Sequence, residues 1–259
     1  MQLIRIGLDI EKTGCENSPR EILNELKKIK SKENGELIYF DKLNLEEIHV
    51  DLDNLIEASW LIKKNSEEVF YKHDKAIFVG GDESISYPIL NSFLKTEKNP
   101  LLIVFDAHAD VGEEEGICRG WLRKIVEEGL RNIILISARN LNQEEIEFIN
   151  KYKIVWIKMD VLREDLRGVC DIVMERARES SGFYINLDMD CVDPGFVPGV
   201  NNLEVGGLSS NDLIYFIKRL ALLDNFRGGD IVGINPNKDF NGISVKLGAR
   251  LLAEMIKMS

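Results

Sequence analysis

The amino-acid sequence predicts a three-layer α/β protein, in which helices cover both faces of an eight-stranded, mostly parallel sheet. Two observations lead to this prediction. Short apolar runs recur along the chain, and several consist of Ile, Val, Leu and Phe without polar alternation, as in strands buried on both faces. Segments with helical spacing of their apolar residues separate these runs, and such strand–helix alternation favours a parallel sheet.

Eight segments have the character of strands. In chain order they are residues 2–8 (QLIRIGL), 36–40, 76–79 (AIFV), 101–105 (LLIVF), 132–136 (NIILI), 153–157 (KIVWI), 183–187 (FYINL) and 230–234 (DIVGI). In a parallel sheet, ligands bind outside the carboxyl ends of the strands. The residues that directly follow each of these segments are therefore the first candidates for a functional site.

Seven segments between the strands have helical character: residues 19–31, 53–72, 120–130, 142–151, 164–180, 209–222 and 243–257. The first shows the signals of a helix start, because Pro19 follows Asn17 and Ser18 and precedes leucines at helical spacing. The chain contains no internal repeat and no linker-like tract. With 259 residues and 44% hydrophobic content, residues 1–259 are interpreted as a single domain with a sizeable core.

The composition excludes several classes of partner. The formal net charge is −11, which argues against binding to nucleic acid or to an anionic membrane surface. No apolar run approaches the length of a membrane span, and the N-terminal residues lack a signal-peptide pattern. The four cysteines are widely spaced, without a CxxC pair, which is typical of reduced thiols. We therefore expect a cytoplasmic protein without nucleic-acid or membrane partners.

Acidic residues and one histidine follow three of the predicted strands. They are Asp82 and Glu83 after residues 76–79, Asp106, His108 and Asp110 after residues 101–105, and Asp188 and Asp190 after residues 183–187. Residues two apart in an extended segment point the same way. We therefore expect these side chains to meet at one edge of the sheet.

So many like charges would repel one another strongly unless cations lie between them. Carboxylates with a single imidazole favour a hard divalent metal such as Mn²⁺, with Fe²⁺, Zn²⁺ and Co²⁺ as competitors. Two such ions about 3.5–4 Å apart would share bridging carboxylates and activate a water molecule. A single DxD pair is more often a solvated turn, so the prediction depends on the joint occurrence of the clusters.

Two further features near these strand ends each allow two interpretations. Cys118 is either a small apolar contact beside Trp121, or a soft metal ligand or a thiolate stabilised by a metal and by Arg119. The acidic run at residues 113–115 is either a solvated loop or a lip that attracts cationic substrates. His49 and His73 do not follow a strand of this group and are interpreted as surface residues.

Five stretches of the sequence together resemble the arginase/agmatinase (ureohydrolase) family. The resemblance rests on the segments GGDES (80–84), DAHAD (106–110), DMDCVDPGFVPG (188–199), EVGGLS (204–209), and NP (235–236) with Asp239 and LGARLL (247–252). It covers nearly the whole chain. It implies the same three-layer α/β fold, a small-molecule substrate with a guanidinium or amidine carbon, and a trimer or hexamer of identical chains.

The resemblance also implies a pair of Mn²⁺ ions. One ion would be held by Asp106, His108, Asp188 and Asp190, and the other by Glu83, Asp106, Asp110 and Asp188. Two ions per chain are expected if Glu83 is a ligand, and one ion otherwise. By the same resemblance, Asp110 is a catalytic candidate, and Asp193 and Glu204 are candidates for substrate binding.

Three positions depart from the family pattern. Glu83 stands where the family has a metal-binding histidine. Cys118 or Arg119, depending on the alignment, stands where many family members have a proton-shuttling histidine. Cys118 and Arg119 are therefore catalytic candidates together with Asp110. Gly233 replaces a glutamate that contacts the guanidinium. The sequence therefore predicts a metal-dependent hydrolase of a non-peptide C–N bond in an amidine or guanidino compound. The alternative is a non-catalytic family member with a structural or regulatory role, with or without one bound metal.

Overall fold

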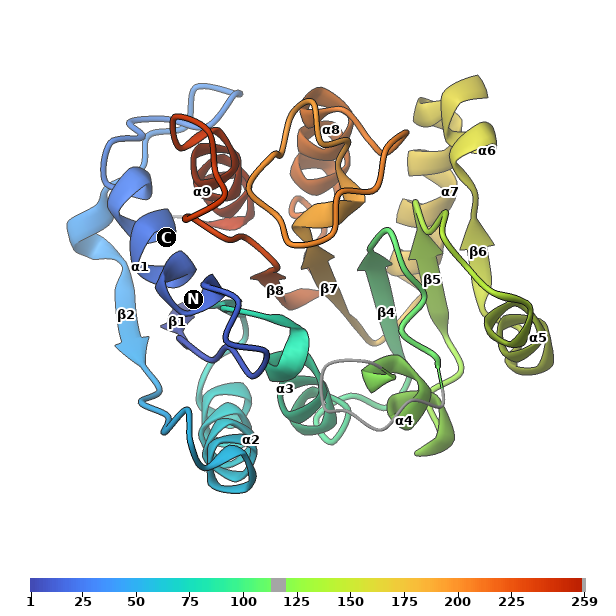
Figure 1. Cartoon of the computed structure of the whole chain (residues 1–259), viewed down its shortest axis with the longest axis horizontal. Helices are drawn as coiled ribbons and strands as arrows, with labels where there is room; N and C mark the ends of the chain where they lie inside the picture. Colours follow the sequence, from blue (N-terminus) through green and yellow to red (C-terminus); the bar gives the residue numbers. More distant parts are fainter. Residues whose placement is uncertain (113–119, 258–259) are drawn as a thin grey trace.

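The computed structural model of the chain describes residues 1–112 and 120–257, and its centre is an eight-stranded sheet in which all neighbouring strands are parallel. The strand order is β2-β1-β3-β8-β7-β4-β5-β6 (Figure 1). The strands are β1 (Gln2–Arg5), β2 (Asn44–Glu47), β3 (Ala76–Val79), β4 (Pro100–Phe105), β5 (Ile133–Ile136), β6 (Val155–Ile157), β7 (Gly182–Asp188) and β8 (Phe226–Val232).

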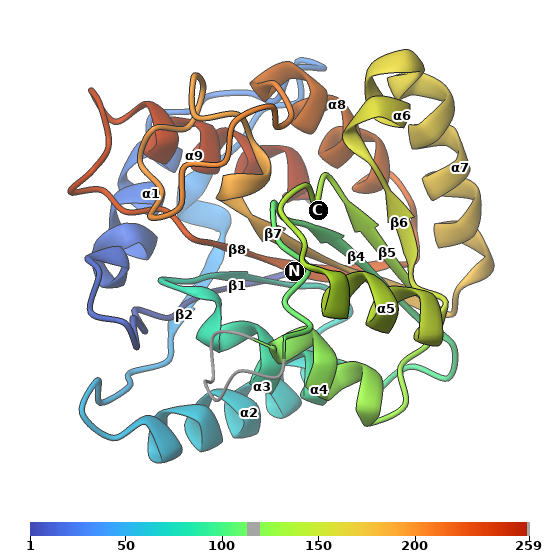
Figure 2. The ribbon, with the colours of Figure 1, turned by 45° about the vertical axis from the view of Figure 1, so that its right-hand side comes forward.

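Helices cover both faces of this sheet, as Figures 1 and 2 show. One face carries α1 (Ser18–Leu26), α6 (Met159–Glu164), α7 (Leu166–Glu179), α8 (Ser210–Leu220) and α9 (Ile243–Met255). The other carries α2 (Leu55–Lys72), α3 (Ser86–Phe93), α4 (Trp121–Glu127) and α5 (Gln143–Tyr152). Each layer has its own apolar core, because both faces of a buried parallel strand need a cover.

The central strands end at the same level. Phe105, the last residue of β4, pairs with Leu187 of β7, and Asp188 at the end of β7 pairs with Val232 of β8. Strand β3 lies on the other side of β8. The carboxyl ends of β3, β8, β7 and β4 therefore form one continuous edge, where the polar segments that follow them meet.

Seven of the eight predicted strands overlap an observed strand, and the prediction for residues 36–40 is wrong. The second strand is Asn44–Glu47, and all four of its residues are exposed. It is an edge strand that pairs only with β1. An exposed edge strand buries too little apolar surface to leave an apolar run in the sequence. Within residues 36–40, the apolar Leu37 and Tyr39 are 53% and 49% exposed.

The predicted helices are all present, with two differences. The helix predicted at residues 164–180 is α7, whereas the short helix α6 before it was not predicted. Asp165 ends α6 and caps the start of α7, where its side chain accepts from the backbone N–H of Gly168. Helix α3 was not predicted either, because its sequence SYPILNSF is only eight residues long and has a proline at its third position. In the described part of the chain, no helix is long and apolar enough to cross a membrane.

Candidate metal centre

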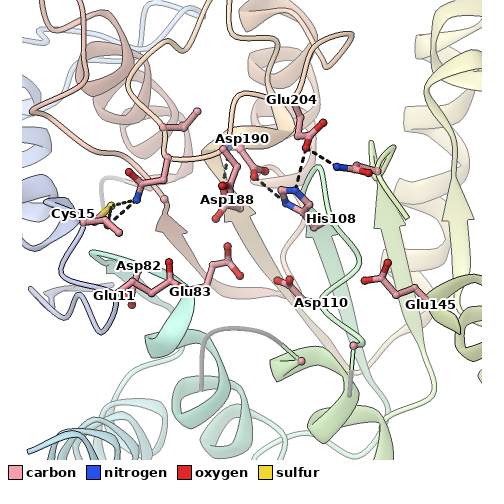
Figure 3. A pocket seen from close by; sticks show the side chains of 18 of the residues that line it. Glu11, Cys15, Asp82, Glu83, His108, Asp110, Glu145, Asp188, Asp190 and Glu204 are labelled. Carbon is pink, nitrogen blue, oxygen red and sulfur yellow. Dashed lines mark hydrogen bonds and ion pairs between the residues drawn. The ribbon is translucent and has the colours of Figure 1, made fainter. Parts of the chain in front are cut away.

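The residues that follow β3, β4 and β7 surround a cavity of about 540 Å³ at this edge of the sheet. Figure 3 shows Glu83, Asp110, His108, Asp188 and Asp190 around it. The prediction that these segments meet is therefore confirmed. Their ligand atoms form two groups, each compact enough to hold a metal ion.

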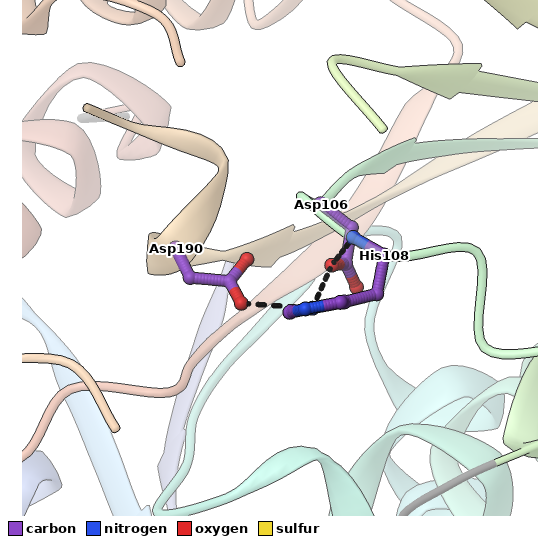
Figure 4. A group of neighbouring side chains, drawn as sticks. All are labelled: Asp106, His108 and Asp190. Atoms are coloured by element: carbon purple, nitrogen blue, oxygen red, sulfur yellow. Dashed lines mark hydrogen bonds and ion pairs between the residues drawn. The ribbon is translucent and has the colours of Figure 1, made fainter. Parts of the chain in front are cut away.

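The first group consists of Asp106, His108 and Asp190, whose ligand atoms lie within 4.8 Å of one another (Figure 4). Nδ1 of His108 lies 3.0 Å from Oδ2 of Asp190 and 3.5 Å from Oδ1 of Asp106. Both aspartates are buried, while the imidazole is half-buried. One nitrogen and two carboxylates at these distances match the donor set of a hard or borderline divalent metal.

The second group consists of Glu83, Asp106 and Asp110, again within 4.8 Å of one another. It contains three carboxylates and no nitrogen. Asp106 belongs to both groups and would therefore be a ligand shared by two ions. Asp188 lines the same cavity without belonging to either group, and it faces Gly233 of the segment after β8.

Tight local turns hold these carboxylates. Oδ1 of Asp106 accepts from the backbone N–H of His108 at 2.7 Å, and Oδ1 of Asp188 accepts from that of Asp190 at 2.8 Å. Oδ1 of Asp190 accepts from the N–H of Ala107 at 3.0 Å, which ties the segments after β4 and β7 together. The segment after β7 is a single 3₁₀ turn, Met189–Cys191, rather than an extended stretch.

Asp110 is positioned differently. Its backbone is left-handed, with φ of 51°, a region that Asp tolerates better than most residues. Its Oδ2 accepts from the indole Nε1 of Trp121 at 2.7 Å, and Trp121, the first residue of α4, is fully buried. A fixed indole therefore sets the direction of the Asp110 carboxylate.

The electrostatics of the cluster favour a cation. Burial and mutual repulsion raise the pKa values of Glu83, Asp106 and Asp188 well above their ordinary values. Among the described residues, no hydrogen-bond partner reaches Oδ2 of Asp106, although this oxygen is buried. A buried carboxylate oxygen without a donor is what a metal ligand looks like before the ion binds.

The pKa of His108 also reflects the excess of negative charge in the cluster. Burial alone would lower the pKa of its imidazole, but Asp106 and Asp190 accept hydrogen bonds from it and add their negative charges. Together they raise the pKa of His108 to about 12. The metal-free cluster thus holds a proton where a divalent ion would supply the positive charge.

The other predicted site residues lie in different places. Glu204 lines the cavity near His108. Asp193 does not line it: its carboxylate accepts from the backbone N–H groups of Gly195 at 2.9 Å and Gly206 at 2.7 Å, which closes the loop between them. Cys118 and Arg119 lie outside the described residues, as do residues 113–115. His49 is exposed and His73 is half-buried, as expected for residues away from the site.

Sequence reasoning missed two residues of the segment after β5. Asn140 lines the cavity and donates from Nδ2 to Oε1 of Glu204 at 2.7 Å. Arg139 donates from Nη2 to the backbone oxygen of Asp190 at 2.8 Å and to that of Glu204 at 2.5 Å. Carboxylates and histidines are the residues that mark a metal site in a sequence, and residues 137–143 contain neither. Its position after a buried strand was the available signal.

The cavity is strongly acidic. Nine of its described lining residues carry carboxylates, and none is Lys or Arg; the nine are Glu11, Asp82, Glu83, Asp110, Glu144, Glu145, Asp188, Asp190 and Glu204. Cys15 also lines it, and burial among these carboxylates raises the pKa of its thiol to about 12. The described cysteines, Cys15, Cys170 and Cys191, are buried and form no disulfide.

The chain is similar in sequence to known proteins. The chain is 30% identical over 232 residues to guanidinobutyrase from Pseudomonas aeruginosa, covering 84% of this chain and 72% of that protein. It is also 30% identical over 189 residues to mitochondrial arginase 1 from Arabidopsis thaliana, covering 70% of this chain. That match spans only about half (54%) of the plant protein's length.

Solved structures show the same fold. The structure of formimidoylglutamase from Bacillus subtilis matches 98% of this chain and 85% of its own, with a TM-score of 0.90 and 24% identity. Arginase from Bacillus subtilis matches 100% of this chain and 99% of its own, with a TM-score of 0.86 and 20% identity. The model of the arginase family itself matches residues 2–257. The chain therefore belongs to the arginase family.

Proposed function

We propose that this protein is a metal-dependent hydrolase that cleaves a non-peptide C–N bond in a small amidine or guanidino compound. The observation that carries the proposal is the position of Asp106, a buried carboxylate shared by two compact groups of metal-ligating atoms. Membership of the arginase family supports it, since relatives of this chain include a guanidinobutyrase and a formimidoylglutamase.

The described residues fit a pair of ions. Asp106, His108 and Asp190 would hold one ion, and Glu83, Asp106 and Asp110 would hold the other. Asp188, buried beside them, would bridge the two. We propose Mn²⁺ for both positions, because carboxylate-rich sites with one imidazole suit it. The chain would bind two ions if Glu83 is a ligand and one ion if it is not.

Ions bound here would lower the pKa of a water molecule and so provide a nucleophile at neutral pH. The protein's own contribution is to orient the acceptor for its proton. Asp110 is the proposed acceptor among the described residues, because Trp121 holds its carboxylate at the cavity wall. Cys118 and Arg119, outside the described residues, remain proposed participants in proton transfer.

The charge of the cavity favours cationic substrates. Carboxylates line it, and among its described lining residues no Lys or Arg balances them. A cavity of one sign concentrates ligands of the opposite sign. We therefore propose a substrate that carries a positive charge, as amidines and guanidines do. Substrate binding by Asp193 has less support, because backbone N–H groups already engage both of its oxygens.

The family resemblance supports the proposal that the protein forms a trimer or hexamer. From its composition we further propose that it works in the cytoplasm and binds neither nucleic acid nor membranes. Light scattering combined with size-exclusion chromatography measures the number of chains directly. A monomer at micromolar concentration would contradict the proposed assembly.

The decisive experiment combines metal analysis with a turnover assay. Protein purified in Mn²⁺ should retain about two ions per chain, and release of ammonia or urea should be screened across amidino, guanidino and formimino compounds. Asp106→Asn keeps the shape of the side chain but removes its charge, and it should abolish both metal and turnover. Failure of the wild-type protein to bind metal in excess Mn²⁺ would contradict the proposal. Metal without any turnover would instead favour the non-catalytic alternative.

A further inference from the structure

The two ring nitrogens of His108 face different partners. Nδ1 is directed toward the metal-ligand carboxylates, 3.0 Å from Oδ2 of Asp190 and 3.5 Å from Oδ1 of Asp106. Nε2 lies on the opposite side of the ring, 3.5 Å from Oε1 of Glu204. In Figure 3, dashed lines join the imidazole of His108 to Asp190 and to Glu204. Glu204 thus faces the nitrogen of His108 that is turned away from Asp106 and Asp190.

Neighbouring residues hold Glu204 in this position. Nδ2 of Asn140 donates to Oε1 of Glu204 at 2.7 Å, the same oxygen that faces the imidazole. The guanidinium of Arg139 donates to the backbone oxygens of Glu204 and Val205 at 2.5 and 3.1 Å. Arg139 also donates to the backbone oxygen of Asp190 at 2.8 Å. One side chain therefore fixes both the segment of Glu204 and the turn of a metal ligand.

We propose that Glu204 is a positioning residue, held by Asn140 and Arg139, that accepts a hydrogen bond from Nε2–H of His108 and keeps Nδ1 as the metal-binding nitrogen. A histidine ligand commonly donates its second N–H to a carboxylate, which fixes the tautomer and the ring orientation. The present separation has to close by about 0.5 Å to reach an ordinary N–H···O distance. The inference rests on the proposed metal centre and deepens it.

This role differs from the one that the sequence predicts for Glu204, which is substrate binding. The two roles have different consequences. A substrate ligand contributes to KM and leaves the affinity of the protein for metal unchanged. A positioning residue acts on metal affinity even when no substrate is present, because it orients His108 and increases its basicity.

The first test measures Mn²⁺ binding by calorimetry in the wild-type protein and in Glu204→Ala and Glu204→Gln. Removing an outer partner of a metal-bound histidine typically weakens the metal by about 10- to 100-fold. We expect that loss in Glu204→Ala at the His108 site. Glu204→Gln keeps an oxygen acceptor and should recover at least part of the affinity. Glu11→Gln removes one charge from the exposed wall of the same cavity and serves as the matched control, with affinity within about threefold of wild type.

The second test observes the imidazole itself. The chain has only three histidines, so ¹⁵N NMR of the Zn²⁺-loaded protein resolves the ring of His108 without crowding. We expect a protonated Nε2 with a downfield, slowly exchanging proton in the wild type. Glu204→Ala should lose that protection, and Glu204→Gln should retain it.

The outcomes separate this inference from the proposed function. Wild-type affinity and an unchanged Nε2 proton in Glu204→Ala would overturn the positioning role alone, while the metal centre stands. A rise in KM in that variant, with unchanged metal affinity, would return Glu204 to substrate binding. Absence of metal binding by the wild-type protein would overturn the proposed function and the inference with it.

Discussion

Gly233 approaches the carboxylate of Asp188 so closely that a β-carbon at position 233 would lie 2.5 Å from Oδ1 and 2.7 Å from Oδ2. The backbone of Gly233 is also left-handed, with φ of 85°. Gly233, which has no β-carbon, thus packs its α-carbon against Asp188, a proposed metal ligand. Both the conformation and the contact require glycine at this position.

The first prediction concerns Gly233→Ala, which should destabilise the protein beyond the cost of its backbone conformation. A left-handed alanine costs about 1–2 kcal/mol. Gly35 provides the matched control, because its φ is 87° and a β-carbon there meets nothing within 4 Å. In urea unfolding, Gly233→Ala should lose at least about 1 kcal/mol more than Gly35→Ala. Equal losses would show that the carboxylate moves aside without cost.

The second prediction concerns the pH dependence of the metal-free protein. Folding raises the pKa values of Glu83, Asp106 and Asp188, so the native state retains protons that the unfolded state releases. This contribution to stability is fully present below the unfolded pKa values near 4 and is lost as pH rises through the folded ones. The free energy of unfolding should therefore fall with rising pH, by about 1.4 kcal/mol per unit for each retained proton.

Urea unfolding in EDTA at a series of pH values between 5 and 8 tests this dependence. Asp188→Asn, which cannot ionise, should flatten the slope and stabilise the metal-free protein at pH 8. Added Mn²⁺ should stabilise the wild type most at the higher pH, since ligands must be deprotonated to bind. A metal-free protein whose stability rises with pH over this range would contradict the assignment of raised pKa values.

The third prediction uses Trp121 as a reporter of the second metal position. Its Nε1 donates to Oδ2 of Asp110 at 2.7 Å, so an ion at Asp110 changes the surroundings of the indole. Adding Mn²⁺ to the metal-free protein should quench its tryptophan fluorescence. Trp121→Phe should lose most of this response, and Trp60→Phe, which removes a half-exposed indole on α2, should keep it. An undiminished response in Trp121→Phe would argue against metal binding at Asp110.

The fold was more predictable from the sequence than the site. Buried strands such as AIFV and LLIVF can be recognised in the sequence, because burial on both faces selects apolar residues throughout. The edge strand NLEE has no such pattern. Asp106 and His108 were predictable because they directly follow a buried strand, where the functional residues of a parallel sheet lie. Arg139 was not, since it acts by donating to backbone oxygens, and nothing in a sequence shows which carbonyl groups a guanidinium will reach.

The fourth prediction concerns Glu83, the position that departs from the family's metal-binding histidine. Its carboxylate lies with those of Asp106 and Asp110, in a group with no nitrogen donor. Glu83→Ala should reduce bound Mn²⁺ from two ions to one, because the His108 group does not use it. Glu83→Gln removes the charge but keeps an oxygen and should weaken the second ion less. Elemental analysis after dialysis measures both, and two retained ions in Glu83→Ala would exclude Glu83 as a ligand.

The last prediction concerns substrate choice. The family resemblance places a glutamate that contacts the guanidinium where this chain has Gly233, and Asp188 already occupies the space beside its α-carbon. A charge-assisted hydrogen bond of this kind is worth about 1.5–3 kcal/mol. Arginine and agmatine should therefore be cleaved roughly 10- to 100-fold more slowly than the best cationic formimino or amidino compound in the same screen. Gly233→Glu should not restore guanidine cleavage, because the new side chain collides with Asp188. Rapid turnover of arginine or agmatine by the wild-type protein would show that another residue binds the guanidinium.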